Sequence, residues 1–143
     1  MKKLLSYLVI CVLTITMFTA CSTSNTDEIR IGINYELSGE NATYGQGSVE
    51  GIELAIEEIN AAGGIDGKKV VAIKYDNQST PAEATTLANK LVSQDKVLAI
   101  LGPATTGCFT SQIPVANKNK VPIATGSATG DNVTFAVDGS VHE

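Results

Sequence analysis

Hydrophobic residues recur along the chain with two alternating periods. Between residues 29 and 37 apolar side chains occupy every second position, which predicts a strand with one buried face. From 45 to 62 they recur every three to four residues, which predicts a helix with one apolar stripe. The same succession predicts the following elements in turn: a strand at 69–76, a helix from Pro81, a strand at 97–101, a helix near Gly107 and a strand at 121–125.

This alternation of strands and helices predicts an α/β fold. Consecutive strands separated by helices form a parallel sheet with right-handed crossovers and helices on both faces. The run VLAIL at 97–101 is apolar throughout, as in a strand covered on both sides. We therefore expect a single parallel sheet sandwiched between helices, with ligands at the carboxyl ends of its strands.

Three local features refine the helices. Thr80 and Glu83 form a capping box, with Pro81 at the first helical position. Gly47 and Gly51 lie four residues apart, and we expect them to let the first helix pack closely on the sheet. Pro114 is expected to bend or cut the third helix, because proline removes an internal hydrogen bond.

The first 20 residues read as an export signal. Two lysines precede an almost uncharged apolar run, and small residues stand just before Cys21. A cysteine in this place resembles the lipobox of bacterial lipoproteins, although Phe18 replaces the usual Leu. The resemblance implies that Cys21 is lipidated and holds the exported protein at the membrane; an ordinary signal peptide is the alternative. Residues 21–28 then form a polar tether.

Composition narrows the possible partners. Two of the ten basic residues lie in the leader, so the other 123 residues carry eight basic and fifteen acidic residues, a net charge of −7. Such a charge argues against nucleic acid, whose binding needs clustered Lys and Arg. Cys108 is the one cysteine after Cys21, so we expect no internal disulfide in the mature chain. Residues 29–143 are long enough for one domain.

Three loops rich in glycine and hydroxyl groups follow predicted strands. They read SGENATYG, GPATTG and GSATGD, and they should meet at one edge of the sheet. Thr105, Thr106, Ser127 and Thr129 supply neutral donors, and the start of the third helix adds backbone N–H groups. This set suits a carboxylate without a lysine. Each loop alone could be an ordinary turn, but three at one edge favour a binding site.

A nucleotide is a poorer fit to the first loop. Its glycines are spaced one residue wider than the dinucleotide pattern and begin some eight residues after the strand. No phosphate-binding lysine follows. We expect no cofactor and no metal.

Four segments together resemble a known family. LSGENATYGQGSVEGIELAIEEINAAGGIDGKKV, YDNQSTPAEATTLANKLV, AILGPATTG and VPIATGSAT closely resemble the periplasmic branched-chain amino acid-binding proteins. The resemblance implies a two-lobed clamshell that closes on a free α-amino acid and delivers it to an ABC permease, without catalysis. It implies that residues 29–143 form an incomplete first lobe.

The resemblance also implies roles for individual residues. Thr106 and Thr129 match hydroxyl residues that hold the ligand carboxylate, Ser127 offers its carbonyl to the ligand ammonium, and Tyr44 lines the pocket. Some relatives join the second and third loops by a disulfide. Here the matching residues are Ser79 and Thr105.

Two other classes of function stay open. Related clamshells serve as amino acid sensors in signalling systems. A hydrolase would need Cys108 as its nucleophile, but the one histidine, His142, lies in a predicted terminal hairpin at 135–143, and a buried apolar Cys108 is the better interpretation. Family members are roughly three times as long, so we expect this chain to be the front part of such a protein.

Overall fold

The computed structural model describes residues 28–131 and 133. The predicted leader (1–20), Cys21, the rest of the tether up to residue 27, and the predicted hairpin at 135–143 with His142 lie outside the described residues. Every structural statement below concerns the described part. There, no helix is both long and apolar enough to cross a membrane.

Four parallel strands form one sheet in the order β2-β1-β3-β4. The strands are β1 (Glu28–Tyr35), β2 (Lys69–Asp76), β3 (Ala99–Leu101) and β4 (Ile123–Ala124). Ile33 of β1 pairs with Lys74 of β2 on one side and with Leu101 of β3 on the other. β2 has the predicted bounds, whereas β1, β3 and β4 end or begin a few residues inside theirs. The parallel α/β fold is confirmed.

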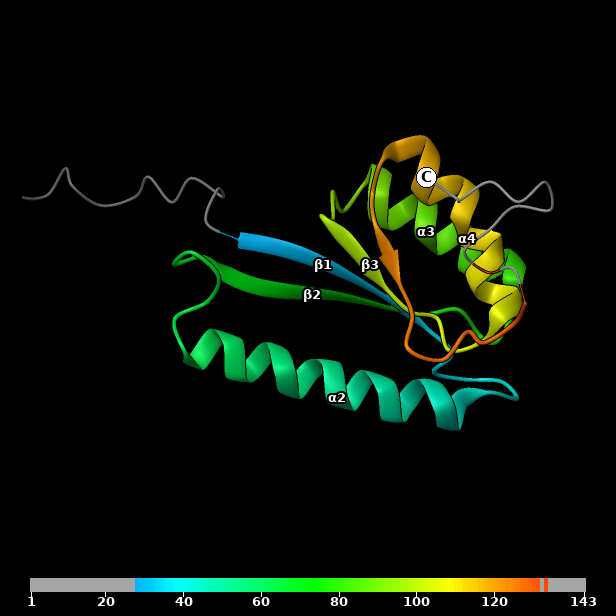
Figure 1. Cartoon of the computed structure of the whole chain (residues 1–143), viewed down its shortest axis with the longest axis horizontal. Helices are drawn as coiled ribbons and strands as arrows, with labels where there is room; N and C mark the ends of the chain where they lie inside the picture. Colours follow the sequence, from blue (N-terminus) through cyan, green and yellow to red (C-terminus); the bar gives the residue numbers. More distant parts are fainter. Residues whose placement is uncertain (1–27, 132, 134–143) are drawn as a thin grey trace, which may run out of the picture.

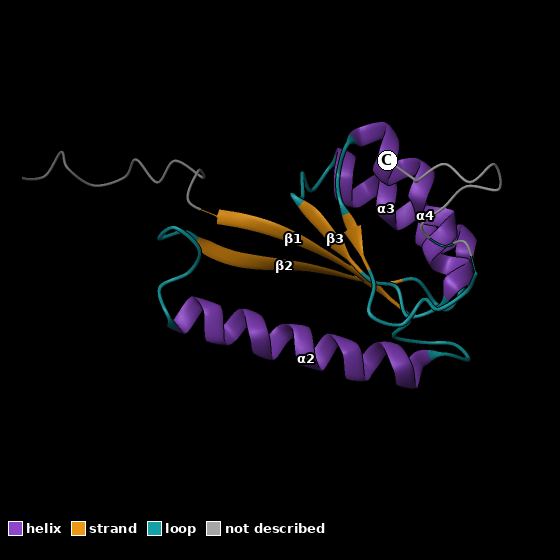
Figure 2. Ribbon diagram, viewed as in Figure 1, coloured by secondary structure: helices purple, strands orange, loops and turns teal. Residues whose placement is uncertain are grey.

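The three helices cover the two faces of this sheet, as predicted. They are α2 (Ala42–Ala61), α3 (Pro81–Ser93) and α4 (Thr106–Asn119). α2 runs along β1 and β2 on one face, and α3 and α4 pack together on the opposite face (Figure 1). Because all strands point the same way, the loops that follow them meet at one end of the sheet, where the chain turns into α2 and α4 (Figure 2).

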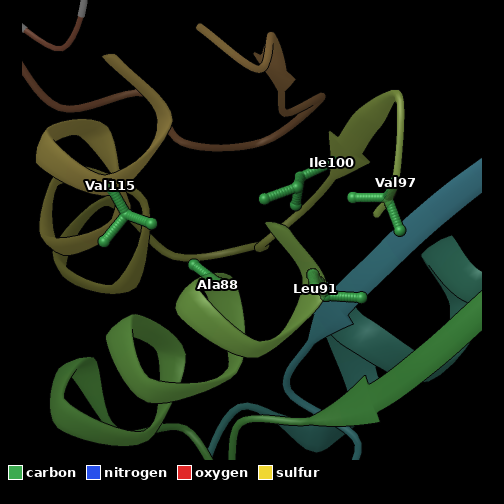
Figure 3. Close-up of a cluster of buried hydrophobic side chains, with 5 residues drawn as sticks. All are labelled: Ala88, Leu91, Val97, Ile100 and Val115. Carbon is green, nitrogen blue, oxygen red and sulfur yellow. The ribbon is translucent and has the colours of Figure 1, made fainter. Parts of the chain in front are cut away.

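Each face has its own hydrophobic cluster. On the α3–α4 side the cluster comprises Ala88, Leu91, Val97, Ile100 and Val115, all at most 8 % exposed (Figure 3). On the α2 side it comprises Ile33, Tyr35, Val49 and Ala104. Alternation along β2 is consistent with the division, since Ala72 packs against the α2-side cluster and its neighbour Ile73 against the other.

The start of α3 follows the predicted chemistry. Thr80 is the N-cap, and its hydroxyl accepts a hydrogen bond from the N–H of Glu83 at 3.4 Å, with Pro81 next in the helix. The return half of the capping box is not made, because the N–H of Thr80 donates to the carbonyl of Asn77. The cap is therefore confirmed and its reciprocal bond is absent.

Pro114 does not cut α4, contrary to expectation. The helix continues from Thr106 to Asn119 with Pro114 inside it. Proline leaves the carbonyl four residues earlier, that of Thr110, without its helical partner. Both Pro114 and Thr110 are exposed, so water can satisfy that carbonyl. Ile113 and Val115 are buried on either side of the proline and hold the helix in place.

The prediction for Gly47 and Gly51 was also wrong. A Cβ added at either glycine would meet no atom within 4 Å, so neither permits close packing. Gly45 does so instead. A Cβ there would lie 2.7 Å from the carbonyl carbon of Glu36 and closer still to its oxygen. Gly45 is one helical turn before the buried Val49, so it belongs to the face that meets the sheet.

Candidate ligand-binding site

A cavity of about 350 Å³ opens at the carboxyl ends of the strands. Its lining residues come from the loop before α2 and the α2 start, from the loop into α4, and from the loop after β4: Asn41, Tyr44, Ala104, Thr105, Thr106 and Ser127. The structure therefore brings together Tyr44, Thr106 and Ser127, three of the four residues predicted to bind a ligand. All three hydroxyl-rich loops are close to it, as the strand order predicts.

Thr129 is placed differently from the other three. It is exposed and does not line the cavity. Its neighbour Gly130 does contact the site, because the Gly130 N–H donates to the hydroxyl oxygen of Thr106 at 3.0 Å. The assignment of Thr129 to a ligand carboxylate stays a prediction.

Thr106 is prepared to donate a hydrogen bond. Its oxygen already accepts from Gly130, so the hydroxyl hydrogen is left for another acceptor. The fit is close: a Cβ on Gly130 would come within 2.5 Å of the Thr106 methyl carbon. Gly130 thus lets the last loop approach Thr106.

The loop after β4 is fastened to the loop after β3. The Thr125 hydroxyl donates to the carbonyl of Pro103 at 2.6 Å and accepts from the N–H of Ala128 at 3.2 Å. The Ser127 hydroxyl donates to the carbonyl of Ala104 at 3.0 Å. These bonds fix the Ser127 backbone, whose carbonyl is the predicted acceptor for a ligand ammonium.

The loop after β1 is held by Asp76 at the end of β2. One carboxylate oxygen of Asp76 accepts from the N–H groups of Leu37, Ser38 and Gln78 at 2.8–3.0 Å. Burial alone raises the pKa of Asp76, but hydrogen bonds from the Ser38 side chain and the three N–H groups outweigh it and hold the pKa below its usual range.

Ser79 joins the same two loops. Its hydroxyl donates to the carbonyl of Ser38 at 2.8 Å and accepts from the N–H of Asn41 at 3.1 Å. The side-chain amide of Asn41 has no hydrogen-bond partner among the described residues, and it lines the cavity. Sequence reasoning missed Asn41, because Asn before a helix is usually a cap.

The loop that leads into α4 is held by Glu36. The N–H groups of Ala104 and Thr105, just before the helix, donate to the buried carboxylate of Glu36 at 2.8 and 3.1 Å. The three following N–H groups, at 106–108, have no acceptor among the described residues. These remain available to a solute.

Cys108 lies at the start of α4 but is only 2 % exposed. Burial raises the pKa of its thiol, an interaction with Thr105 lowers it in part, and the nearby Glu36 carboxylate raises it again. The net rise disfavours the thiolate that a nucleophile needs. The apolar, buried interpretation of Cys108 is therefore confirmed. Among the described residues there is no group of three or more potential His, Cys, Asp or Glu metal ligands.

The family model of the periplasmic binding proteins matches residues 28–140. The chain belongs to the periplasmic binding protein family.

Its relatives in this family include receptors for branched-chain amino acids. The Leu/Ile/Val-binding protein homolog 3 of Brucella melitensis is 36 % identical over 107 residues, which are 75 % of this chain and 29 % of that protein. The substrate binding protein of a branched-chain amino acid transporter from Streptococcus pneumoniae, solved with isoleucine, is 47 % identical with a TM-score of 0.74. That match covers 75 % of this chain and 31 % of the other.

A third similar protein was solved with a different solute. A solute binding protein of an ABC transporter from Rhodopseudomonas palustris, in complex with 3,4-dihydroxybenzoic acid, is 27 % identical with a TM-score of 0.71. The match covers 80 % of this chain and 30 % of that one. This chain thus spans less than a third of the length of these two-lobed relatives.

Proposed function

We propose that this chain forms the first-lobe wall of an extracytoplasmic receptor that binds a free α-amino acid, most favourably a branched-chain one, and delivers it to an ABC permease. The observation that carries the proposal is the cavity lined by Thr106, the first residue of α4, and by the two residues before it. The kinship with branched-chain amino acid receptors supports the choice of solute.

The lining suits a carboxylate held by neutral donors. Among residues 28–131 and 133, no Lys or Arg lines the cavity, whereas the Thr106 hydroxyl and the N–H groups at 106–108 lie at the positive end of α4. A hydrogen bond to a charged group contributes about 1.5–3 kcal/mol. Isoleucine and 3,4-dihydroxybenzoic acid, the solutes of the two solved relatives, both carry a carboxylate.

The experiment is calorimetry on the complete reading frame that encodes this chain. Leucine, isoleucine and valine should bind, and 3,4-dihydroxybenzoate tests the second candidate class of solute. Thr106→Val removes the donor and should weaken binding at least tenfold. Thr86→Val is the matched control, because the Thr86 hydroxyl bonds only to a carbonyl within α3. Binding of sugars alone, or equal affinities in the two variants, would refute the proposal.

One wall should bind weakly by itself. Tyr44, which lines the cavity, is 69 % exposed, so a bound solute would keep much of its contact with water. Hydrogen bonds made in water largely replace bonds to solvent, and an ammonium without a desolvated acidic partner loses on the order of 2–5 kcal/mol. We expect residues 22–143 alone to bind isoleucine in the millimolar range or beyond. Micromolar binding by this part alone would contradict the single-wall argument.

Attachment to the membrane is a separate proposal. Cys21 would carry lipid on the outer side of the cytoplasmic membrane, where two or more acyl chains give stable anchoring. Mass spectrometry of the mature N-terminal peptide should show acyl mass on Cys21, and an unmodified cysteine would exclude the lipid anchor.

A sensing role is the alternative to import. It requires a signalling domain in the same reading frame or in a neighbouring one.

A further inference from the structure

We propose that Glu36 is a positioning residue of the solute site. Glu36 is the first residue after β1, and it is 0 % exposed. Its two carboxylate oxygens accept three hydrogen bonds from the loop that leads into α4. One oxygen accepts from the N–H of Ala104 at 2.8 Å, and the other from the N–H and the hydroxyl of Thr105 at 3.1 and 2.7 Å.

A carboxylate suits this set of donors. The two backbone N–H groups can only donate, the Thr105 hydroxyl donates as well, and a carboxylate accepts at both oxygens. A glutamine would turn an NH₂ group toward one of the two N–H groups, and that N–H group would lose its acceptor. A buried carboxylate is otherwise unfavourable, so its presence depends on these bonds and on the positive end of α4.

Glu36 also determines which backbone donors are available to a solute. It accepts the hydrogen bonds of the N–H groups at 104 and 105, and the N–H of Phe109 donates to the carbonyl of Thr105. The N–H groups at 106–108 between them are therefore free within the described part of the chain. Ala104 and Thr105, which Glu36 holds, and Thr106, which follows them, all line the cavity. The carboxylate thereby fixes the loop that presents Thr106.

The Glu36 backbone is fixed as well. Gly45, in the first turn of α2, lies directly against the backbone atoms of Glu36, with no room for a Cβ. Tyr44 is the residue before it and also lines the cavity. Glu36 therefore connects the starts of α2 and α4, the two helices whose first residues border the cavity.

This inference rests on the proposed function for its binding readout, and Glu36→Gln in the complete reading frame tests it. Affinity for isoleucine should fall at least tenfold, and hydrogen exchange in the peptide 102–109 should accelerate at least tenfold. Asn34→Ala is the control: Asn34 is also buried, on β1, but its amide donates to the carbonyl of Ala84 in α3 and to the side chain of Gln112 in α4, and it makes no hydrogen bond to the loop that leads into α4. That variant should lose stability and retain affinity.

The outcomes separate cleanly. Should Glu36→Gln fail to fold, Glu36→Asp replaces it, because the charge is retained but the carboxylate falls short of the loop by about 1.5 Å; it too should weaken binding and speed exchange at 102–109. The inference is overturned if the loss of affinity simply follows the loss of stability. In that case Asn34→Ala would lose as much affinity for isoleucine as the Glu36 variant does. If the wild type binds none of the tested carboxylates, the proposed function fails. The role of Glu36 is tested separately by hydrogen exchange: an unchanged exchange rate at 102–109 in the Glu36 variant overturns this inference.

Discussion

Replacing Gly45 by alanine should destabilise the fold, whereas the same change at Gly47 should stabilise it. A Cβ at Gly45 would lie 2.7 Å from the carbonyl carbon and 3.0 Å from the nitrogen of Glu36. Carbon atoms in favourable contact are about 3.5–4.0 Å apart. The obstructing atoms belong to the backbone at the end of a buried strand and cannot rotate away, so the first turn of α2 has to move.

The magnitudes follow from the two environments. Overpacking of this kind costs about 1–3 kcal/mol, and rigid backbone neighbours place Gly45→Ala at the upper end. The helix propensity of alanine returns about 1 kcal/mol, which leaves a net loss of about 2 kcal/mol. Gly47 is exposed in the same helix with nothing within 4 Å, so Gly47→Ala gains about 1 kcal/mol. The two variants should differ by about 3 kcal/mol.

Urea and thermal denaturation of the two variants and the wild type measure this difference. For a domain of this size, about 3 kcal/mol corresponds to a separation of roughly 12–24 °C in Tm. The urea m-value should stay constant, because neither change alters the surface exposed on unfolding. The reasoning is refuted if Gly45→Ala is as stable as Gly47→Ala, since α2 would then not be pressed against Glu36.

Three further predictions concern a carboxylate, a thiol and a loop. The pKa of Asp76 is lower in the folded than in the unfolded protein, so its carboxylate stabilises the fold fully above the unfolded pKa of about 4, and this contribution disappears as pH falls through the folded pKa. Asp76→Asn should therefore flatten the acidic part of a plot of urea midpoint against pH. An unchanged slope would contradict this prediction. Because burial raises the pKa of the Cys108 thiol, iodoacetamide should label Cys108 in urea and leave it unlabelled in the native protein, as mass spectrometry can determine. Gly130→Ala should displace Thr106 and weaken isoleucine binding about tenfold in calorimetry, whereas Gly126→Ala, which meets nothing within 4 Å, should bind as the wild type does.

The regular elements could be predicted because their causes are local. A short run rich in apolar, β-branched residues with a turn at each end predicts β2 to the residue, and Thr80 with Pro81 predicts the start of α3. Pro114 shows where a local rule gives way. Proline removes one hydrogen bond from a helix. The loss of free energy is small here, because water reaches this face of α4, and the burial of Ile113 and Val115 outweighs it.

The error over the glycines has a different origin. A spacing of four residues says that Gly47 and Gly51 share a helix face, but it does not say that this face meets the sheet. The apolar residues contain that information. The stripe that includes Val49 and Ile52 extends back by one turn to Gly45, so the buried face could have been found by following it.

The location of the candidate site could be predicted from the sequence, but only some of its residues could. Parallel strands bring their carboxyl-end loops together, so the neighbourhood of Tyr44, Thr106 and Ser127 follows from topology and the family resemblance. Glu36 could not be found in this way. It contacts residues 68 and 69 positions later in the chain, and nothing in the local sequence distinguishes it from a solvent-exposed glutamate after a strand.

Side-chain hydrogen bonds near the cavity join the loops at the carboxyl ends of the strands to one another. Asp76 holds the loop after β1, Glu36 holds the loop after β3, and Thr125 and Ser127 hold the loop after β4 against it. Two of these holders are buried or partly buried carboxylates that accept backbone N–H groups. Acidic side chains are thereby used inside the lobe to shape a site that offers neutral donors to a solute. Such an arrangement is consistent with the proposal that a chain with a net charge of −7 over residues 21–143 binds a carboxylate, although no basic residue lines the cavity in the described part.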